Sequence, residues 1–438
     1  MKKILSFLLA LVLMFSLAAC GSPKNGDSKG DVSKTTDNNS NQASTQNKDQ
    51  ASSSELKPEE GASLLVWESK GKEGDFIKYV AKEFEKKYGV PVKYEEVGTV
   101  DAEGRLAQDG PAGTGADVFA APHDHTGGLV ASGLIIPNSV YGDRIKKEFM
   151  KAAVDGVSYG GKLYGYPTAI ETYALFYNKD IFPKAPKTFD EIIAKAKEFN
   201  DTDNNKYTFM WDVANAYFSH CFIAGEGGYI FGKGGTDKND VGIDSKGAIA
   251  GAKEMLKLKE ILPVNSGDSS SQIVEGLFQE GSVGAMINGP WAVAATKKSG
   301  INFGIAPLPL LSNGKHPTGF SGIRTLFVSS YTKYPKAAQL FANFATSKEM
   351  LLKRYEMTHQ IPPVKALVDE PTIKNDEYVA PFLEQAQYAV PMPSIPQMRL
   401  VWEPYGAAFA AFWNGESTPE DALKNAAETV REAIKSQE

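Results

Sequence analysis

Ala62-Ser63-Leu64-Leu65-Val66-Trp67 is the stretch that decides the fold, together with the helical pattern and the second apolar run that follow it. The run is short and apolar, which favours a buried strand. In residues 75–84 apolar side chains recur at helical spacing, with Asp75 as the expected cap and Gly89 as the expected stop. Residues 90–97 then predict the next strand. A strand, a helix and another strand in succession indicate an α/β domain.

The rest of the chain keeps this alternation. Further strands are predicted at residues 116–121, 172–178, 208–211, 283–287, 303–306 and 323–329. Further helices are predicted at residues 188–199, 246–261, 271–280, 335–346, 348–356 and from Thr418 onward. This pattern is typical of α/β architecture with mostly parallel sheets, where ligand-binding residues gather in loops past the carboxyl ends of strands. Residues from about 60 onward are too many for one typical core, so we expect two domains.

The N-terminus has the pattern of an exported lipoprotein. Lys2 and Lys3 precede an apolar run that is too short for a comfortable membrane span of about 20 residues, which indicates a signal peptide over residues 1–19. Leu17-Ala18-Ala19-Cys20 matches the bacterial lipobox, in which the cysteine thiol receives a diacylglyceryl group. We therefore expect lipidation at Cys20 and a lipid anchor on the outer face of a bacterial cytoplasmic membrane. The alternative is a secreted protein with a chance cysteine.

Residues 20–60 predict a disordered tether, because the polar chain after Cys20 cannot bury enough apolar surface to offset its ordering entropy. The only other cysteine is Cys221, so lipidation of Cys20 leaves no intramolecular disulfide. The formal charge is −6 and no basic stripe is present, which argues against nucleic acid as a partner. Neither a phosphate loop nor a dinucleotide fingerprint is found, and the Gly-rich residues 110–115 lack the Lys-Ser/Thr that a nucleotide needs. We expect no cofactor.

Several patches together resemble the maltose- and maltodextrin-binding proteins of bacterial ABC importers, in extracellular solute-binding protein family 1. The patches are residues 115–119, 123–128, 161–167, 170–172, 175–180, 216–218, 226–229, 285–291 and 395–398, with Trp402. They occur in order and at compatible spacing over residues 62–438. The resemblance implies a lipoprotein that captures maltodextrin-type oligosaccharides and delivers them to the transmembrane subunits of an ABC permease, without catalysis. We expect it to act as a monomer.

The resemblance also implies a periplasmic-binding-protein-like fold, in which two α/β domains are joined by a hinge and hold the ligand in the cleft between them. It places the N-terminal lobe at residues 61–170 plus 322–374. The C-terminal lobe is placed at residues 171–321 plus 375–438. Closure of the lobes around the sugar is then favoured by contacts that exist only in the closed form.

Two acidic residues are the expected hydrogen-bond acceptors of the sugar. Asp124 follows a predicted strand and Glu171 lies at the edge of another, where side chains can point into a cleft. Ionised carboxylates make charge-assisted hydrogen bonds to hydroxyl groups. Taken alone, each residue is equally consistent with a solvated loop carboxylate. The resemblance assigns both to the ligand site, in the first domain or at the edge of the hinge.

Aromatic rings are the second requirement of a sugar site, because they stack on the apolar face of a pyranose. The resemblance assigns this role to Tyr217, Trp291 and Trp402 on the second domain, and a further ligand position to Lys72. Core packing is the alternative for Trp402, and Phe218 competes with Tyr217 for the stacking position.

The chain also departs from the family pattern. Ala121-Pro122 stands where the family usually has a Trp, and His125 stands where an Arg follows. Asn215 replaces a Glu, Gly406 replaces an Arg, and Gly71 replaces an Asp. Each change removes a stacking plane or a charged partner, which leaves the sugar and the preferred chain length open.

Residues 201–212 have the ligand spacing of a calcium loop, from Asp201 to Asp212 at the twelfth position. Lys206 stands where Gly allows the sharp turn, and the last carboxylate is Asp rather than Glu. A polar loop between helix and strand is the favoured interpretation, so we expect no metal site.

Two other functions compete with maltodextrin binding. The first is a surface glycosidase in which Asp124 and Glu171 act as acid and nucleophile or base. The second is the same binding fold with a different oligosaccharide, such as a xylo- or galacto-oligosaccharide or a cyclodextrin.

Overall fold

The computed structural model describes residues 56–437, so the predicted signal peptide, Cys20 and most of the predicted tether lie outside the described residues. The strands are β1 (Leu64–Glu68), β2 (Val92–Glu96), β3 (Val118–Pro122), β4 (Ser158–Tyr159), β5 (Lys162–Leu163), β6 (Tyr166–Glu171), β7 (Ala174–Asn178), β8 (Asp237–Val241), β9 (Ala285–Asn288), β10 (Phe303–Ala306), β11 (Phe320–Val328) and β12 (Val390–Pro391). None of the helices within residues 56–437 is both long and apolar enough to span a membrane.

The α-helices fall mostly between the strands, as the sequence predicts. They are α1 (Lys72–Tyr88), α2 (Ala102–Asp109), α3 (Thr126–Ala131), α4 (Gly142–Glu148), α5 (Lys151–Gly156), α6 (Phe189–Phe199), α7 (Ala216–Gly225), α8 (Gly232–Gly235), α9 (Lys246–Leu256), α10 (Ser271–Gln279), α11 (Val293–Ser299), α12 (Pro335–Ala345), α13 (Lys348–Thr358), α14 (Lys365–Val368), α15 (Pro371–Lys374), α16 (Ala380–Gln385), α17 (Trp402–Asn414) and α18 (Pro419–Lys435).

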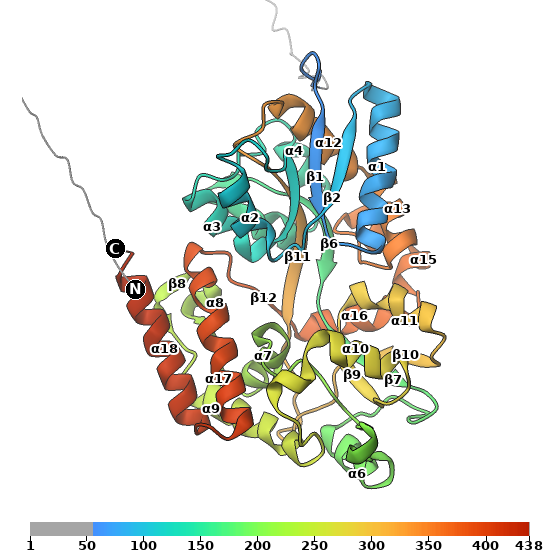
Figure 1. Cartoon of the computed structure of the whole chain (residues 1–438), viewed down its shortest axis with the longest axis vertical. Helices are drawn as coiled ribbons and strands as arrows, with labels where there is room; N and C mark the ends of the chain where they lie inside the picture. The colour runs from blue at the N-terminus through green and yellow to red at the C-terminus, as the bar shows by residue number, and fades with distance from the viewer. Residues whose placement is uncertain (1–55, 438) are drawn as a thin grey trace, which may run out of the picture. The chain divides into compact units, whose positions relative to one another are not determined.

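Two larger sheets, in addition to the two-stranded sheet of β4 and β5, organise most of the strands (Figure 1). The first has the order β12-β11-β3-β1-β2, with β6 also paired to β11. Helices α1, α12 and α13 pack together beside it, and α1 contacts both β1 and β2. The second sheet has the order β10-β7-β9, and α16 contacts β7 and β10. Helices α7, α9, α17 and α18 form a packed group of their own. The two sheets with their helices are consistent with the two-domain α/β architecture that the sequence predicts, and the predicted lobe boundaries stay a prediction.

The prediction of mostly parallel sheets is wrong. Only the pairs of β1 with β2 and β3, and of β11 with β12, are parallel among the named strands, whereas β11 runs antiparallel to β3 and β6, and the whole second sheet is antiparallel. The reason is the route of the chain: β6 leaves the first sheet toward β7 and β11 returns to it, and Figure 1 shows the two strands side by side. A strand that leaves and a neighbour that returns must run in opposite directions.

Local differences from the predicted elements have simple causes. Helix α1 begins at Lys72 rather than after Asp75, because Gly71 takes a φ of 83° and turns the chain directly into the helix. Residues 208–211 are not a named strand, although isolated parallel bridges join Tyr207 to Val283 and Met210 to Met286, near β9. The caps at Thr188 and Thr418 are confirmed, since each side chain accepts a hydrogen bond from the first turn of its helix.

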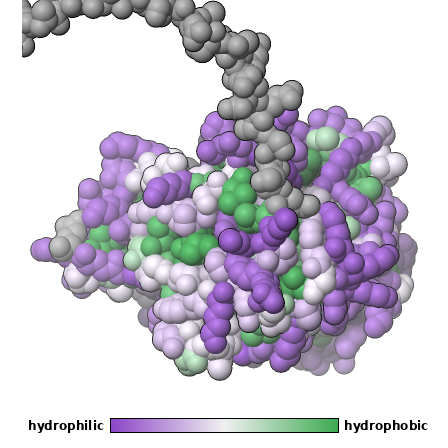
Figure 2. Space-filling view, turned by 90° about the horizontal axis from the view of Figure 1, so that it is seen from above, coloured by the Kyte–Doolittle hydropathy of each residue, from purple (hydrophilic) through white to green (hydrophobic). Residues whose placement is uncertain are grey.

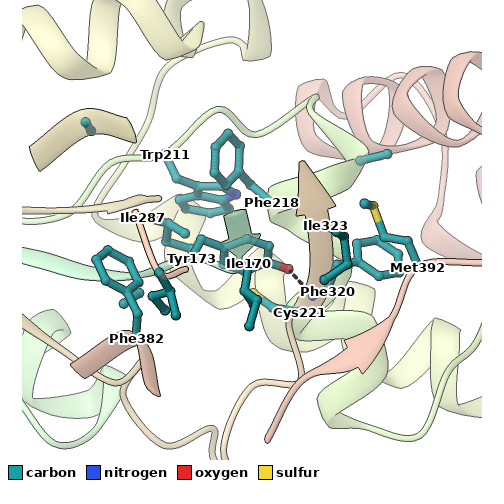
Figure 3. Close-up of a cluster of buried hydrophobic side chains, with 14 of the residues drawn as sticks. Ile170, Tyr173, Trp211, Phe218, Cys221, Ile287, Phe320, Ile323, Phe382 and Met392 are labelled. Carbon is teal, nitrogen blue, oxygen red and sulfur yellow. Dashed lines mark hydrogen bonds between the residues drawn. The ribbon is translucent and has the colours of Figure 1, made fainter. Parts of the chain in front are cut away.

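The core beside the segments that connect the two sheets, after β6 and at the start of β11, is rich in aromatic side chains. Figure 3 shows Tyr173, Trp211 and Phe218 packed with aliphatic neighbours around Cys221. The Tyr173 hydroxyl accepts a hydrogen bond from the backbone N–H of Phe320 at 3.4 Å, which joins the connection after β6 to the start of β11. Cys221 is a free, fully buried thiol whose pKa is raised by burial, so it serves as a small apolar side chain.

A buried ion pair lies between β1 and β11. Arg324 donates from Nη2 and Nε to the two carboxylate oxygens of Glu68, at 2.5 and 3.4 Å, and neither side chain is appreciably exposed. Burial alone would raise the pKa of Glu68, yet the charges of Arg324 and Arg354 hold it below its ordinary value. Glu68 is therefore an ionised group inside the protein. The charges of its two arginine partners keep it ionised.

We expect Glu68→Gln to lower the free energy of unfolding by about 3 kcal/mol, because it removes the buried negative charge that compensates both Arg324 and Arg354. Chemical denaturation measures this loss. Glu96→Gln is the matched control, since Glu96 is the residue opposite Glu68 on β2 and is exposed. Its effect should stay within about 0.5 kcal/mol. Equal effects of the two substitutions would contradict a structural role for the ion pair.

Candidate functional site

Asp124 lies just past the carboxyl end of β3, in the short 3-10 helix η1 (His123–His125). Its side chain is buried rather than in an exposed polar loop, with 6% of the residue exposed. Trp402 Nε1 donates to its Oδ2 at 3.1 Å, whereas its Oδ1 is buried and has no hydrogen-bond partner among the described residues. A buried acceptor without a donor carries a free-energy cost, so this oxygen keeps an unused capacity to accept a hydrogen bond.

His123 fixes the backbone that presents Asp124. The backbone N–H of Ile323 donates to His123 Nδ1 at 3.1 Å, so the ring proton must be on Nε2. Nε2 then donates to the carbonyl oxygen of Met392 at 3.2 Å. Burial lowers the pKa of His123, and the neutral ring thus joins η1 to β11 and to the segment after β12. The sequence places this histidine in a polar loop and does not predict its role.

Glu171 is the last residue of β6, where the chain leaves the first sheet. Gln360 Nε2 donates to its Oε1 at 2.9 Å, and Arg324 Nη1 donates to the same oxygen at 3.3 Å. Burial raises the pKa of Glu171, while the charges of Arg324 and Arg354 act in the opposite direction. The Glu171 carboxylate is therefore fixed by hydrogen bonds to protein side chains and is not a solvated loop carboxylate.

The predicted aromatic residues gather around Phe320, at the start of β11. The ring of Tyr217 stacks on Phe320 with 6.0 Å between centroids, and the ring of Trp402 meets Phe320 edge-on at 5.9 Å. Trp291 lies 6.3 Å from Tyr217. Tyr217, Trp291 and Trp402 are each only partly buried, whereas Phe218 is buried, which favours Tyr217 over Phe218 as the accessible ring.

The negative charges of Asp124 and Glu171 both act on the hydroxyl of Tyr217. The pKa of the Tyr217 hydroxyl is raised well above its ordinary value, first by burial and then by Glu171 and Asp124. Trp291 itself lies in the 3-10 helix η5 (Pro290–Ala292), folded over Gly289. A Cβ atom at Gly289 would lie 2.1 Å from the Trp291 ring, so only glycine allows this position of the indole.

Lys72 is placed differently from the other predicted site residues. It is the first residue of α1, and its exposed ammonium group lies 3.9 Å from Asp75 Oδ2. Within residues 56–437 no hydrogen bond or ion pair joins it to Asp124, Glu171 or the aromatic group. Its role in the site stays a prediction.

Three of the departures from the family pattern have local structural roles. His125 Nδ1 lies 2.7 Å from Glu103 Oε2, and despite burial the charges of Asp124 and Glu103 raise the pKa of His125. The Asn215 side chain caps α7 by accepting from the backbone N–H of Tyr217 at 3.1 Å. At Gly406 a Cβ atom would lie 2.9 Å from the carbonyl oxygen of Ala214. The missing Glu and Arg are thus replaced by residues that fit the backbone around α7 and α17.

Two carboxylates of the calcium-loop pattern in residues 201–212 have hydrogen-bond partners within the protein. Asp212 Oδ2 accepts from both the backbone N–H and the hydroxyl of Ser271, at 3.0 and 2.7 Å. Asp201 accepts from the side chain of Asn204 at 2.7 Å. In the part of the chain that the structure describes, no three His, Cys, Asp or Glu side chains are grouped to hold a metal ion. The interpretation as a polar loop stays a prediction.

Comparisons with known proteins define the class. Residues 79–381 match the family model described as bacterial extracellular solute-binding protein. A galactooligosaccharide-binding protein of Bacillus subtilis is 35% identical over 99% of this chain and 98% of its own length. A maltooligosaccharide ABC transporter solute-binding lipoprotein of Streptococcus pneumoniae is 31% identical over 82% of this chain and 86% of its own.

A solved cyclo/maltodextrin-binding protein in complex with maltotetraose is 40% identical to this chain. The alignment covers 85% of this chain and 97% of that one, with a TM-score of 0.72. The fold and the site thus define a periplasmic-binding-protein-like protein with two α/β domains. The chain belongs to the bacterial extracellular solute-binding proteins, a family of binding proteins and not of enzymes.

The lowered pKa of His123 predicts a specific pH dependence of stability. As the pH falls, the unfolded chain takes up the histidine proton first, so the stabilisation is complete above an unfolded pKa of about 6.5 and is lost below it. Between pH 7.5 and 5.5 the free energy of unfolding should fall by about 1 kcal/mol more in the wild type than in His123→Gln. The glutamine amide can still accept from Ile323 and donate to Met392.

Denaturant titrations at the two pH values measure this difference. His316→Gln is the control, because His316 is only partly buried and stacks on Tyr388. The same pH dependence in the wild type and His123→Gln would contradict the assignment of a neutral, bridging His123.

Proposed function

We propose that this protein captures an oligosaccharide of the maltodextrin type between its two lobes and delivers it to the permease of an ABC importer. The observation that carries the proposal is the presence of both carboxylates and accessible rings. Asp124 and Glu171 each accept hydrogen bonds from protein side chains on one carboxylate oxygen. The partly exposed rings lie in contact with one another or with Phe320, and they are Tyr217, Trp291 and Trp402. This combination matches the chemistry of a sugar, whose hydroxyls need charged acceptors and whose C–H faces need flat rings.

The proposed lobes are those predicted from the sequence. The N-terminal lobe spans residues 61–170 plus 322–374, and the C-terminal lobe spans residues 171–321 plus 375–438. Asp124 belongs to the first and the three rings to the second, so a bound sugar gains its full set of contacts only when the lobes approach. Closure then follows from the higher affinity of the closed form.

The cellular placement is part of the proposal. A lipid on Cys20 and the tether of residues 20–60 hold the protein on the outer face of the cytoplasmic membrane, beside the transmembrane subunits of the permease. The lipobox residues and the lipoprotein relative from Streptococcus pneumoniae support this placement. We further propose that the protein acts as a monomer, binds no nucleic acid and catalyses no reaction.

A galactooligosaccharide is the second candidate ligand. The relative named for it is similar to this chain over nearly the whole length of both proteins. The maltotetraose complex, at higher identity, and the maltooligosaccharide lipoprotein favour the maltodextrin class instead.

Isothermal titration calorimetry of the purified protein tests both candidates, with maltotriose, maltotetraose, a β-linked galactotriose and β-cyclodextrin as ligands. We expect saturable binding that is tightest for a linear maltodextrin. Tighter binding of the galactotriose would replace the proposed ligand class, and no binding of any of the four would overturn the function. Chromatography of maltotetraose after incubation tests the glycosidase alternative, which requires hydrolysis that Glu171→Gln abolishes.

We expect Trp291→Ala to weaken binding of the preferred oligosaccharide at least about fivefold, or about 1 kcal/mol, because a stacking surface is lost. Calorimetry of the folded variant measures the change. Tyr331→Ala is the control, since Tyr331 is an exposed ring beyond the end of β11 that pairs with the start of β3. An unchanged affinity of Trp291→Ala would show that the indole lies outside the site.

A further inference from the structure

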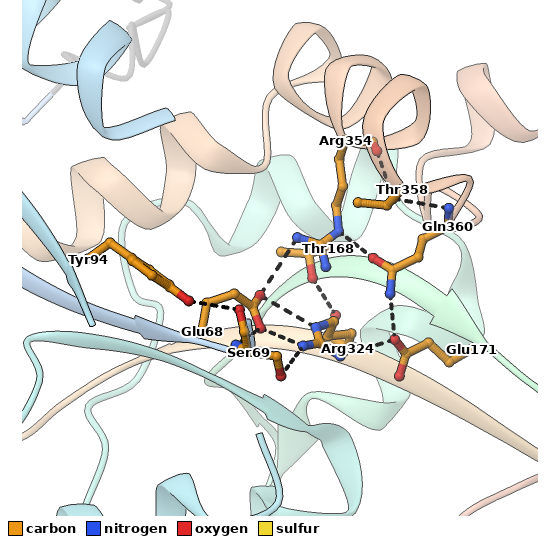
Figure 4. A network of polar contacts seen from close by, with 9 residues as sticks. All are labelled: Glu68, Ser69, Tyr94, Thr168, Glu171, Arg324, Arg354, Thr358 and Gln360. Carbon is orange, nitrogen blue, oxygen red and sulfur yellow. Dashed lines mark hydrogen bonds and ion pairs between the residues drawn. The ribbon is translucent and has the colours of Figure 1, made fainter. Parts of the chain in front are cut away.

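The carboxylate of Glu171 is held on one side only. Figure 4 shows Gln360 and Arg324 converging on the same oxygen, Oε1, while the second oxygen points away from both. Two donors on one oxygen stop the carboxylate from rotating freely. Oε1 of Glu171 is thus held by two protein donors, whereas Oε2 is left for another partner.

Gln360 is itself held in one orientation. Its Oε1 accepts from Arg354 Nε at 2.9 Å, and its backbone N–H donates to the Thr358 hydroxyl at 3.1 Å. Because the amide oxygen faces Arg354, the amide NH₂ must face Glu171. Gln360 is 1% exposed, and it lies just after the end of α13.

Arg324 is fixed from the opposite side. Glu68 binds two of its guanidinium nitrogens, and Nη2 also donates to the Ser69 hydroxyl at 2.8 Å. The remaining nitrogen, Nη1, donates to Glu171. The polar network therefore runs from β1 through β11 to the end of β6, and from α13 to the same carboxylate. Each member that donates to Glu171 is locked by a further buried partner.

We propose that Gln360 and Arg324 are positioning residues for ligand binding, which hold Oε1 of Glu171 so that Oε2 is presented as an oriented acceptor to a sugar hydroxyl. The inference rests on the proposed function and deepens it. A preorganised acceptor costs less ordering free energy on binding than a rotating one and accepts a hydrogen bond from fewer directions. The network thus contributes to affinity through Glu171 without itself contacting the sugar.

The alternative is that the network only stabilises the packing of β1, β6, β11 and α13. A double-mutant cycle separates the two, because a positioning effect must disappear when Glu171 no longer offers a carboxylate. Gln360→Met keeps the length of the side chain and removes its amide. Gln385→Met is the matched control, since Gln385 is also fully buried and hydrogen-bonded, to Leu308 and Pro317.

Calorimetry with maltotetraose on the full folded protein measures the cycle, with β-linked galactotriose as the second probe. We expect Gln360→Met to weaken binding about five- to tenfold in the wild-type background and less than twofold in Glu171→Gln. Gln385→Met should leave the affinity within twofold of the wild type. Should Gln360→Met not fold, Gln360→Glu replaces it, because it keeps the acceptor for Arg354 and opposes Glu171 with a second carboxylate.

The outcomes are distinguishable. An unchanged affinity of the Gln360 variant, or a loss of the same size in the Glu171→Gln background, overturns the inference while the proposed function stands. Wild-type affinity of Glu171→Gln removes Glu171 from the site, and the inference with it. No binding of either probe by the wild-type protein overturns the proposed function itself.

Discussion

The ion pair between Glu68 and Arg324 is the constraint on which the site depends. It joins the carboxyl end of β1 to β11, the strand that returns to the first sheet after the excursion through the second. A charged pair in the interior persists only when both partners are held in good geometry, because each ion has lost its water. The position of β11 is therefore set by electrostatics as well as by backbone pairing with β3 and β6.

Strand β11 carries both halves of the proposed site. Side chains two residues apart share one face of a strand, so Phe320 and Arg324 lie on the same side, with Gly322 between them. Phe320 is the ring around which Tyr217 and Trp402 gather, and Arg324 is a donor to Glu171. One strand thus sets the distance between the aromatic rings around Phe320 and the carboxylate of Glu171. A shift in the register of β11 would move Phe320 and Arg324 together.

The candidate site residues and the helix caps could be predicted from the sequence. Strand direction and the partners of Glu171 could not, for a physical reason. Asp124, Glu171 and the three rings lie in local patterns of the right chemistry, and the helix caps at Thr188 and Thr418 are local signals. Strand direction, by contrast, depends on where the chain goes next. The partners of Glu171 are distant in sequence: Arg324 and Gln360 are 153 and 189 residues away. The one available signal was the presence of charged residues, Glu68 and Arg324, at the end of one apolar strand and inside another.

The two acids differ in how each is held. The donors to Glu171 are Arg324 on β11, in the first sheet, and Gln360 just after α13, which packs with α1 and α12. The donor to Asp124 is Trp402, the first residue of α17, which packs with α7 and α18. In the proposed lobes Asp124 and Trp402 lie on opposite sides of the cleft, so separation of the lobes would remove the indole N–H from Asp124. Glu171 stands at the lobe boundary itself, where β6 pairs with β11. In the proposed function, the hydrogen bond between Trp402 and Asp124 is a contact that exists only in the closed form, and such contacts favour closure.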